Sequence, residues 1–86
     1  MLEEARKEID IIDKQLVKLI ANRFAVVKSV WKYKKSVNMP VVQADRWQQV
    51  LDSKKKLWIE HGLSEDFIAD IWNRIHEEAI RLEEKE

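Results

Sequence analysis

The sequence contains no cysteine, and among its 86 residues it has one glycine, Gly62, and one proline, Pro40. Without cysteine, disulfide bonds and thiolate metal sites are excluded. Strands and hairpins depend on turns rich in glycine and proline, and this chain has almost none of that turn chemistry. The sequence therefore predicts an all-α protein.

The sequence also lacks an excess of charge of either sign, because 16 Lys and Arg residues balance 16 Asp and Glu residues. It has no basic field that would attract nucleic acid or an anionic membrane. The apolar runs are short and broken by charges, and the first residues lack the regions of a signal peptide. We therefore expect a cytoplasmic protein with no nucleic-acid partner and no membrane partner, so that any anion site is local.

Residues 2–37 contain neither glycine nor proline and predict one long helix. At about 1.5 Å per residue, this helix would span about 54 Å, whereas a compact chain of this length is only about 30 Å across. Its apolar face would need cover from a second copy, which predicts an intertwined homodimer. We call this face the heptad seam, after its alternating spacings of three and four. Its members are Leu2, Ala5, Ile9, Ile12, Leu16, Leu19, Arg23, Val26, Val30, Tyr33 and Val37.

Local signals predict two further helices, at residues 43–61 and 64–84. Pro40 ends the first helix near residue 37, since the residue before a proline avoids the helical conformation. Gly62 is placed to end the second helix, and Ser64 to cap the third. The expected architecture is a single domain, residues 1–86, whose small core becomes stable when two copies form a six-helix dimer.

One position on the heptad seam, Arg23, is unsuited to an apolar core. A buried guanidinium without a counter-charge costs several kcal/mol, so it either pairs with an acid or awaits an anionic ligand. Lys34 lies within about 20° of the same face and about 16 Å further along the axis. Arg46 follows the bend that returns the chain over Lys34. Arg6 is about 25 Å along the axis from Arg23, so it could reach only the site of a partner chain. Such cations suit a small dianion.

Conventional catalytic sites are absent from the sequence. It has no glycine-rich phosphate loop, no helical pair of histidines, and no serine with a histidine and an acid as companions. His61 and His76 are interpreted as ordinary surface or dipole-facing histidines, too few to hold zinc. We expect neither a metal nor a cofactor.

Several short stretches share the order and spacing of one known family. They are residues 5–13 (ARKEIDIID), residues 19–23 (LIANR), Lys34, Pro40, the pair Asp45-Arg46, and residues 75–80 (IHEEAI). In these stretches the chain resembles the small, all-helical chorismate mutases. The resemblance covers nearly the whole chain, and the joint spacing of the four cations is more specific than any single motif.

The resemblance implies a domain-swapped dimer in which each site takes Arg23, Lys34 and Arg46 from one chain and Arg6 from the other. The family converts chorismate to prephenate by a [3,3] rearrangement, with no cofactor and no covalent intermediate. By the family's roles, Arg6 and Arg23 would hold the two carboxylates with help from Arg46. Lys34 would donate to the ether oxygen, and the side chain at position 83 would be a second donor.

The chain departs from the family at four of its site positions. Glu83 stands where many relatives have Gln, and a carboxylate can only accept hydrogen bonds, so Glu83 would act protonated. Gln43 stands where Asp is common, and Trp47 where several relatives have an acid that binds the substrate's hydroxyl. Ala79 replaces a serine that would bind a carboxylate. The changes at Gln43, Trp47 and Ala79 each lose one polar contact, worth about 0.5 to 1.5 kcal/mol, which predicts weaker binding or a reshaped hydroxyl region.

Two other functions stay open at this point. An isochorismate-pyruvate lyase has a similar fold and cationic cage, although the Asp45-Arg46 spacing after Pro40 fits the mutase pattern better. A non-catalytic dimerisation or regulatory module, fused to or associated with another shikimate-pathway enzyme, is the alternative from a different class. Arg23 on an apolar face argues against a pure scaffold.

Overall fold

The computed structural model describes residues 1–39 and 44–84, which form three α-helices and no strand. They are α1 (Leu2–Ser36), α2 (Ala44–Glu60) and α3 (Glu65–Glu84). The all-α prediction with three helices is confirmed. Both α1 and α2 end one residue earlier than expected and α3 begins one residue later, whereas the expected start of the second helix at residue 43 lies outside the described residues.

Local chemistry explains where the helices end. Gly62 adopts a positive φ of 79° and Asn38 one of 57°, the left-handed conformation that terminates helices. After α2, the Leu63 amide donates to the Trp58 carbonyl at 2.9 Å, as in a Schellman motif. The Ser64 hydroxyl then accepts a hydrogen bond from the Phe67 amide at 3.2 Å and caps α3.

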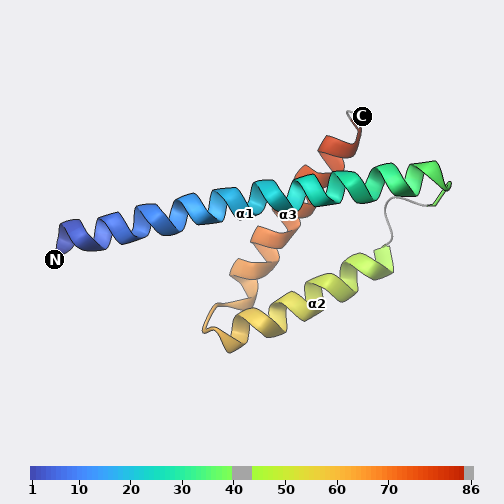
Figure 1. The fold of residues 1–86 in the computed structure, drawn as a ribbon. Coiled ribbons are helices and arrows are strands. Elements are labelled where there is room, and N and C mark those ends of the chain that lie inside the picture. The colour runs from blue at the N-terminus through green and yellow to red at the C-terminus, as the bar shows by residue number, and fades with distance from the viewer. Residues whose placement is uncertain (40–43, 85–86) are drawn as a thin grey trace.

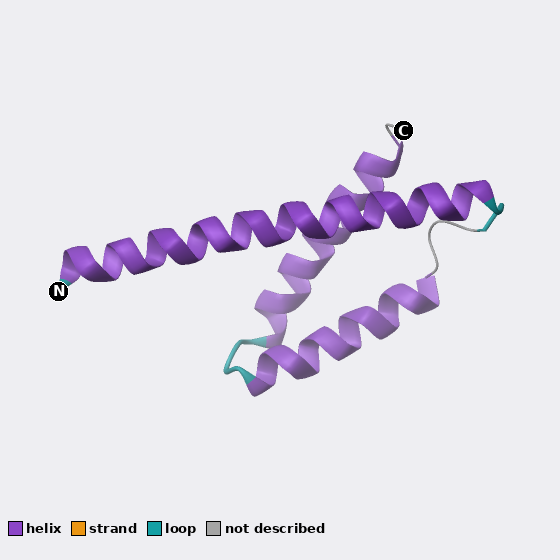
Figure 2. Cartoon of the chain, in the orientation of Figure 1, coloured by secondary structure: helices purple, strands orange, loops and turns teal. Residues whose placement is uncertain are grey.

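The three helices are arranged as a long rod with two shorter helices beside its C-terminal half (Figure 1). α3 crosses α1, and α2 packs against α3 after the tight turn around residue 62 (Figure 2). The buried apolar side chains come from all three helices: Trp31, Leu51, Ile68 and Ala79. The N-terminal part of α1 projects beyond this small core, and every side chain from residue 1 to residue 22 is exposed.

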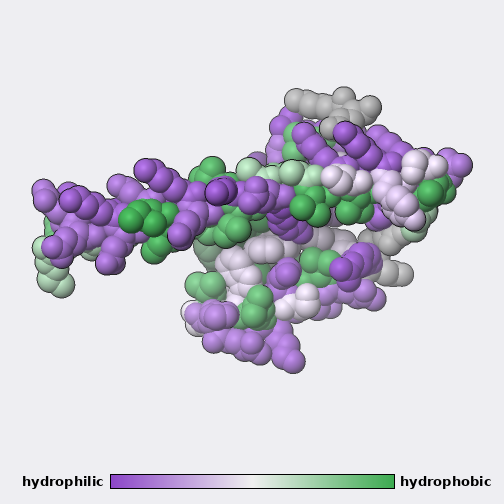
Figure 3. Space-filling view, viewed as in Figure 1, coloured by the Kyte–Doolittle hydropathy of each residue, from purple (hydrophilic) through white to green (hydrophobic). Residues whose placement is uncertain are grey.

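The projecting helix makes the chain elongated. Its principal extents are 55 × 25 × 16 Å and its radius of gyration is 15.9 Å, against about 12 Å for a compact chain of this length. Apolar side chains lie on the surface along α1, including the part beyond α3 (Figure 3). The 35 residues of this helix are more than the core of one chain can cover.

The apolar members of the heptad seam are not on the face that α1 buries within its own chain, and only Arg23 of the seam is partly buried there. Two of its members, Val26 and Tyr33, are 64% and 63% exposed. The buried side chain of α1 is instead Trp31, which lies off the seam and is 7% exposed. The helix therefore has two apolar faces, one packed against its own chain and one left uncovered.

No helix among residues 1–39 and 44–84 is long and apolar enough to cross a membrane. The cytoplasmic location expected from the sequence stays a prediction.

Replacing Ile68, the fully buried side chain of α3, tests the core. We expect Ile68→Ala to lower the free energy of unfolding by about 2 to 5 kcal/mol, because it leaves a cavity. The matched control is Ile59→Ala on α2, where the side chain is 52% exposed and the cost should be below about 1 kcal/mol. Urea denaturation followed by circular dichroism measures both. Equal costs would contradict the packing described here.

Candidate active site

A cavity of about 150 Å³ lies where the three helices meet. Each helix supplies part of its wall, and the lining side chains are Arg23, Val27, Trp31, Lys34, Arg46, Trp47, Val50, His76, Ala79 and Ile80. Helical periodicity explains the contribution of α1, because its four residues follow one another at spacings of four, four and three. Arg23 and Lys34 thus stand at the two ends of an apolar strip.

Arg23 is the cation with the most restricted surroundings. Its side chain is partly buried, and burial lowers the pKa of the guanidinium. Its Cζ atom lies 5.9 Å from the ring centroid of Trp72, a cation–π contact that leaves the net charge in place. No described carboxylate forms an ion pair with it. The sequence argument required either an acid or an anionic ligand for this group, and the described residues supply no acid.

Two further cations face the same cavity. Lys34 is partly buried and Arg46 is exposed, and neither forms an ion pair with a described carboxylate. Among the described residues, the cavity lining includes three cations and no acid. A small molecule with two carboxylates would complement this arrangement, since guanidinium groups bind carboxylates through paired hydrogen bonds.

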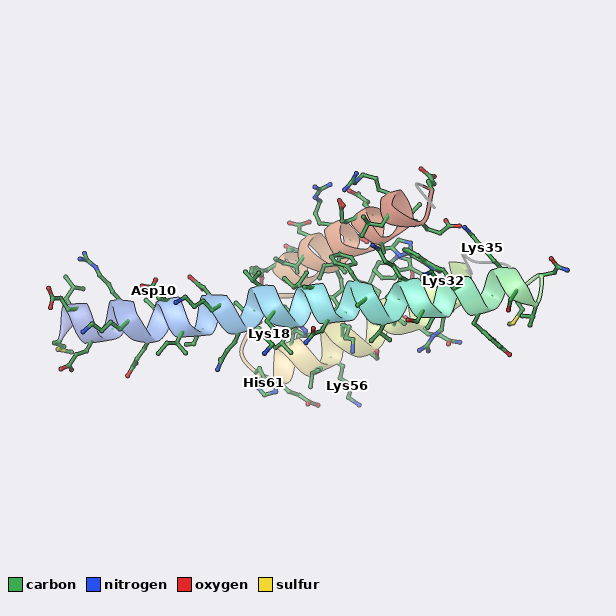
Figure 4. All side chains as sticks on the ribbon, turned by 45° about the horizontal axis from the view of Figure 1, so that its top comes forward. Asp10, Lys18, Lys32, Lys35, Lys56 and His61 are labelled. Atoms are coloured by element: carbon green, nitrogen blue, oxygen red, sulfur yellow. The ribbon has the colours of Figure 1, made fainter. Side chains whose placement is uncertain are left out.

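His76 also lines the cavity, so its interpretation as an ordinary surface or dipole-facing histidine is wrong. Its ring stacks on Trp47 with centroids 3.9 Å apart and planes 11° apart. Burial and the charge of Arg23 lower the pKa of His76, against a smaller opposing effect of Glu77. The neutral imidazole is therefore favoured. By contrast, His61 is exposed at the end of α2 (Figure 4).

The structure brings together five of the eight site residues that were predicted from the sequence. Arg23, Lys34, Arg46, Trp47 and Ala79 all line the cavity. The other five lining residues were not predicted: Val27, Trp31, Val50, His76 and Ile80. The sequence contained a signal for two of them. Val27 and Trp31 follow Arg23 by four and eight residues, which places them on the same face of the helix.

The remaining three predicted residues lie elsewhere or are not described. Arg6 is exposed on the projecting part of α1, about 25 Å along the axis from Arg23. Glu83 is not among the lining residues, and its Oε1 atom lies 3.9 Å from Nζ of Lys35. Lys35 itself is near the C-terminal end of α1 (Figure 4). Gln43 lies outside the described residues.

The described parts of the chain do not form a metal-binding site. They contain no group of three or more His, Asp or Glu side chains that could hold a metal ion.

The sequence matches a family model described as chorismate mutase type II over residues 5–84. The chain belongs to this family. The match includes every cavity-lining residue, so the cationic cavity lies wholly within the family's domain.

Several individual proteins are also similar to the chain. A chorismate mutase from Methanocaldococcus jannaschii is 37% identical over 65 residues, which cover 76% of this chain and 66% of that protein. A 4-amino-4-deoxychorismate mutase from Streptomyces venezuelae is 28% identical over 83 residues, covering 96% and 81%. A bifunctional chorismate mutase/prephenate dehydratase from Aquifex aeolicus is 28% identical over 87 residues, covering 98% and 24%.

The matched region thus covers just under two thirds of the length of the M. jannaschii protein and about a quarter of the length of the A. aeolicus protein. No solved structure matches the chain.

Proposed function

We propose that the chain is a chorismate mutase, which converts chorismate to prephenate by a [3,3] rearrangement without a cofactor. The observation that carries the proposal is Arg23, a partly desolvated guanidinium without a described acid partner, in one cavity with Lys34 and Arg46. Chorismate has two carboxylates and an enol ether, so it supplies the negative charge that the described residues lack. Family membership supports the same conclusion.

The cavity would act by positioning and by electrostatics. The rearrangement breaks the ether carbon–oxygen bond and forms a carbon–carbon bond within one molecule, so it needs no nucleophile and no external proton. Arg23 would hold a carboxylate with help from Arg46, and the apolar strip around Val27 and Trp31 would restrict the substrate to a compact shape. Lys34 would donate a hydrogen bond to the ether oxygen, where negative charge develops in the transition state.

The proposal includes a domain-swapped homodimer of six helices, which the surface of the single chain supports. One chain exposes 7063 Å², whereas a compact monomer of the same mass exposes about 5,400 Å². The excess of roughly 1,700 Å² per chain would place the dimer among obligate interfaces, which bury about 2,000 to 5,000 Å² in total. The uncovered heptad seam would supply the apolar contact, and the projecting part of α1 would carry Arg6 into the partner's cavity.

Glu83 is proposed as a second hydrogen-bond donor to the ether oxygen. It follows Ala79 by four residues on α3, so it lies on the same face one turn further along. Its side chain is 18% exposed. A carboxyl group donates only when it is protonated, which ties this role to acidic pH. Gln43 and Trp47 would contribute to substrate binding, together with the small side chain of Ala79.

A fused or associated shikimate-pathway enzyme is also part of the proposal. The chain matches only 24% of the bifunctional A. aeolicus relative, in which a mutase domain is one part of a larger protein.

Replacing Arg23 tests the proposed function directly. We expect Arg23→Ala to lower kcat/KM for chorismate at least about 100-fold, or about 2.7 kcal/mol, because a charge-assisted contact with a carboxylate is lost. The matched control is Arg74→Ala on α3, where the side chain is 77% exposed and paired with Glu77, and where activity should be unchanged. The loss of chorismate absorbance measures the rate.

Three results would contradict the proposal in different ways. If the unmodified protein does not consume chorismate, the mutase function is wrong. If it converts isochorismate to salicylate and pyruvate instead, the lyase is the correct function. If a dicarboxylate transition-state mimic leaves the melting temperature unchanged, the chain is a scaffold rather than an enzyme.

Mixing two inactive variants tests whether Arg6 acts across the dimer. Each site would combine Arg6 of one chain with Arg23 of the other, so a heterodimer of Arg6→Ala and Arg23→Ala chains has one intact site. After joint unfolding and refolding, random pairing should restore about a quarter of the normal activity. A mixture as inactive as its components would show that both arginines act within one chain, and size-exclusion chromatography with light scattering would check the dimer itself.

The role of Glu83 predicts a particular pH profile. The rate should be higher at acidic pH than at neutral pH, because a carboxyl group donates a hydrogen bond only in its protonated form. Glu83→Gln should flatten the profile, since an amide donates at every pH. The matched control is Glu84→Gln on the same helix, at an exposed position, which should keep the normal profile. A profile that does not rise below neutral pH would refute this role.

A further inference from the structure

His76 differs chemically from every other side chain that lines the cavity. The arginines, the lysine and the two tryptophans can only donate hydrogen bonds, and the four aliphatic side chains have no polar atom. A neutral imidazole has one nitrogen that donates and one that accepts. Among the described lining residues, His76 is therefore the single side chain able to accept a hydrogen bond from a ligand.

The surroundings of His76 keep this lone pair available. No described group forms a hydrogen bond with its ring, whose one specific contact is the stack on Trp47. Arg23 and Lys34 on α1 and Arg46 on α2 line the same cavity, and these positive charges oppose protonation. The nearest acid on its own helix, Glu77, is paired with Arg74 at 2.8 Å. Burial and Arg23 both lower the pKa of His76.

The proposed substrate has a hydrogen-bond donor that matches the acceptor on His76. The proposed substrate carries, besides its two carboxylates, a ring hydroxyl whose hydrogen requires an acceptor once it is removed from water. None of the other described lining side chains, Trp47 included, can accept this hydrogen. The ring of His76 is stacked on Trp47 with centroids 3.9 Å apart, so the one described acceptor is held in a fixed plane at the cavity wall.

We propose that His76 determines substrate specificity by accepting a hydrogen bond from the ring hydroxyl of chorismate, while Trp47 acts as a positioning residue that fixes the plane of the imidazole. This inference rests on the proposed function and adds to it. It assigns a substrate-binding role to a residue that has no part in the positioning of the carboxylates or in the donation to the ether oxygen.

The same chemistry predicts which ring substituent the site rejects. An amine in place of the hydroxyl is protonated at neutral pH and would bring a fourth positive charge to three cations, with no carboxylate among the described lining residues to neutralise it. The site should therefore prefer the hydroxyl substrate. We expect kcat/KM for the amino analogue to be at least about 10-fold lower than for chorismate.

The decisive experiment is a double-mutant cycle between His76 and the hydroxyl. Chorismate and an analogue with hydrogen in place of the hydroxyl are compared on the unmodified protein and on His76→Phe, which keeps an aromatic ring against Trp47. We expect His76→Phe to raise KM for chorismate about 3- to 10-fold with kcat within about twofold. The inhibition constant of the deoxy analogue should not change. His76→Gln, which regains an acceptor, should recover part of the loss.

Control variants separate this role from a structural one. His61→Phe, at the exposed end of α2, should leave both constants unchanged. If His76→Phe weakens chorismate and the deoxy analogue equally, His76 only packs and the inference is wrong. It is equally wrong if the preference for the hydroxyl disappears in Gln43→Leu but persists in His76→Phe, because the acceptor is then Gln43.

The outcome for the unmodified protein distinguishes this inference from the proposed function. If the protein does not turn over chorismate, both are overturned. If it turns over chorismate but binds the deoxy analogue equally well, only the role of His76 is overturned. This comparison needs no variant, so it decides the question even if His76→Phe does not fold.

Discussion

The guanidinium of Arg23 is the constraint around which the site is organised. A cation that is partly removed from water needs compensation, and the described residues offer it the face of Trp72 but no carboxylate. The helices nevertheless place it beside a cavity that holds two more cations. Such an arrangement is costly in an empty site and favourable with a bound dianion, so the electrostatics of the cavity are complementary to a ligand rather than to the protein itself.

A second constraint is geometric. α1 is about as long as the whole molecule, whereas the core formed with α2 and α3 covers only its C-terminal half. The helix presents one apolar face to its own chain through Trp31 and leaves the apolar members of the heptad seam exposed. A helix with two such faces suits an intertwined dimer, because each copy can cover the surface that the other cannot. The proposed position of Arg6 in a partner's site follows from the same length.

The pair Trp47 and His76 gives one wall of the cavity a chemistry different from that of its three cations. The cations that would bind the carboxylates line the cavity from α1 and α2. The wall that would meet the hydroxyl has an indole and an imidazole stacked on each other. An acid in that wall would carry charge at neutral pH, whereas the neutral imidazole offers a lone pair without a charge, and the surrounding cations favour that state.

The amino-acid sequence by itself determined the three helices and, to within one residue, the end of α1, the end of α2 and the start of α3. Asn38, Gly62 and Ser64 act there through hydrogen bonds to residues a few positions away. It also determined that Arg23 and Lys34 share a face, since helical periodicity alone aligns them. Only the tertiary structure decided that Trp31 rather than the heptad seam is buried, and that His76 lines the cavity. These outcomes depend on how α3 crosses α1 and packs against α2. That packing results from many weak contacts between residues distant in sequence, and no local sequence pattern encodes such contacts.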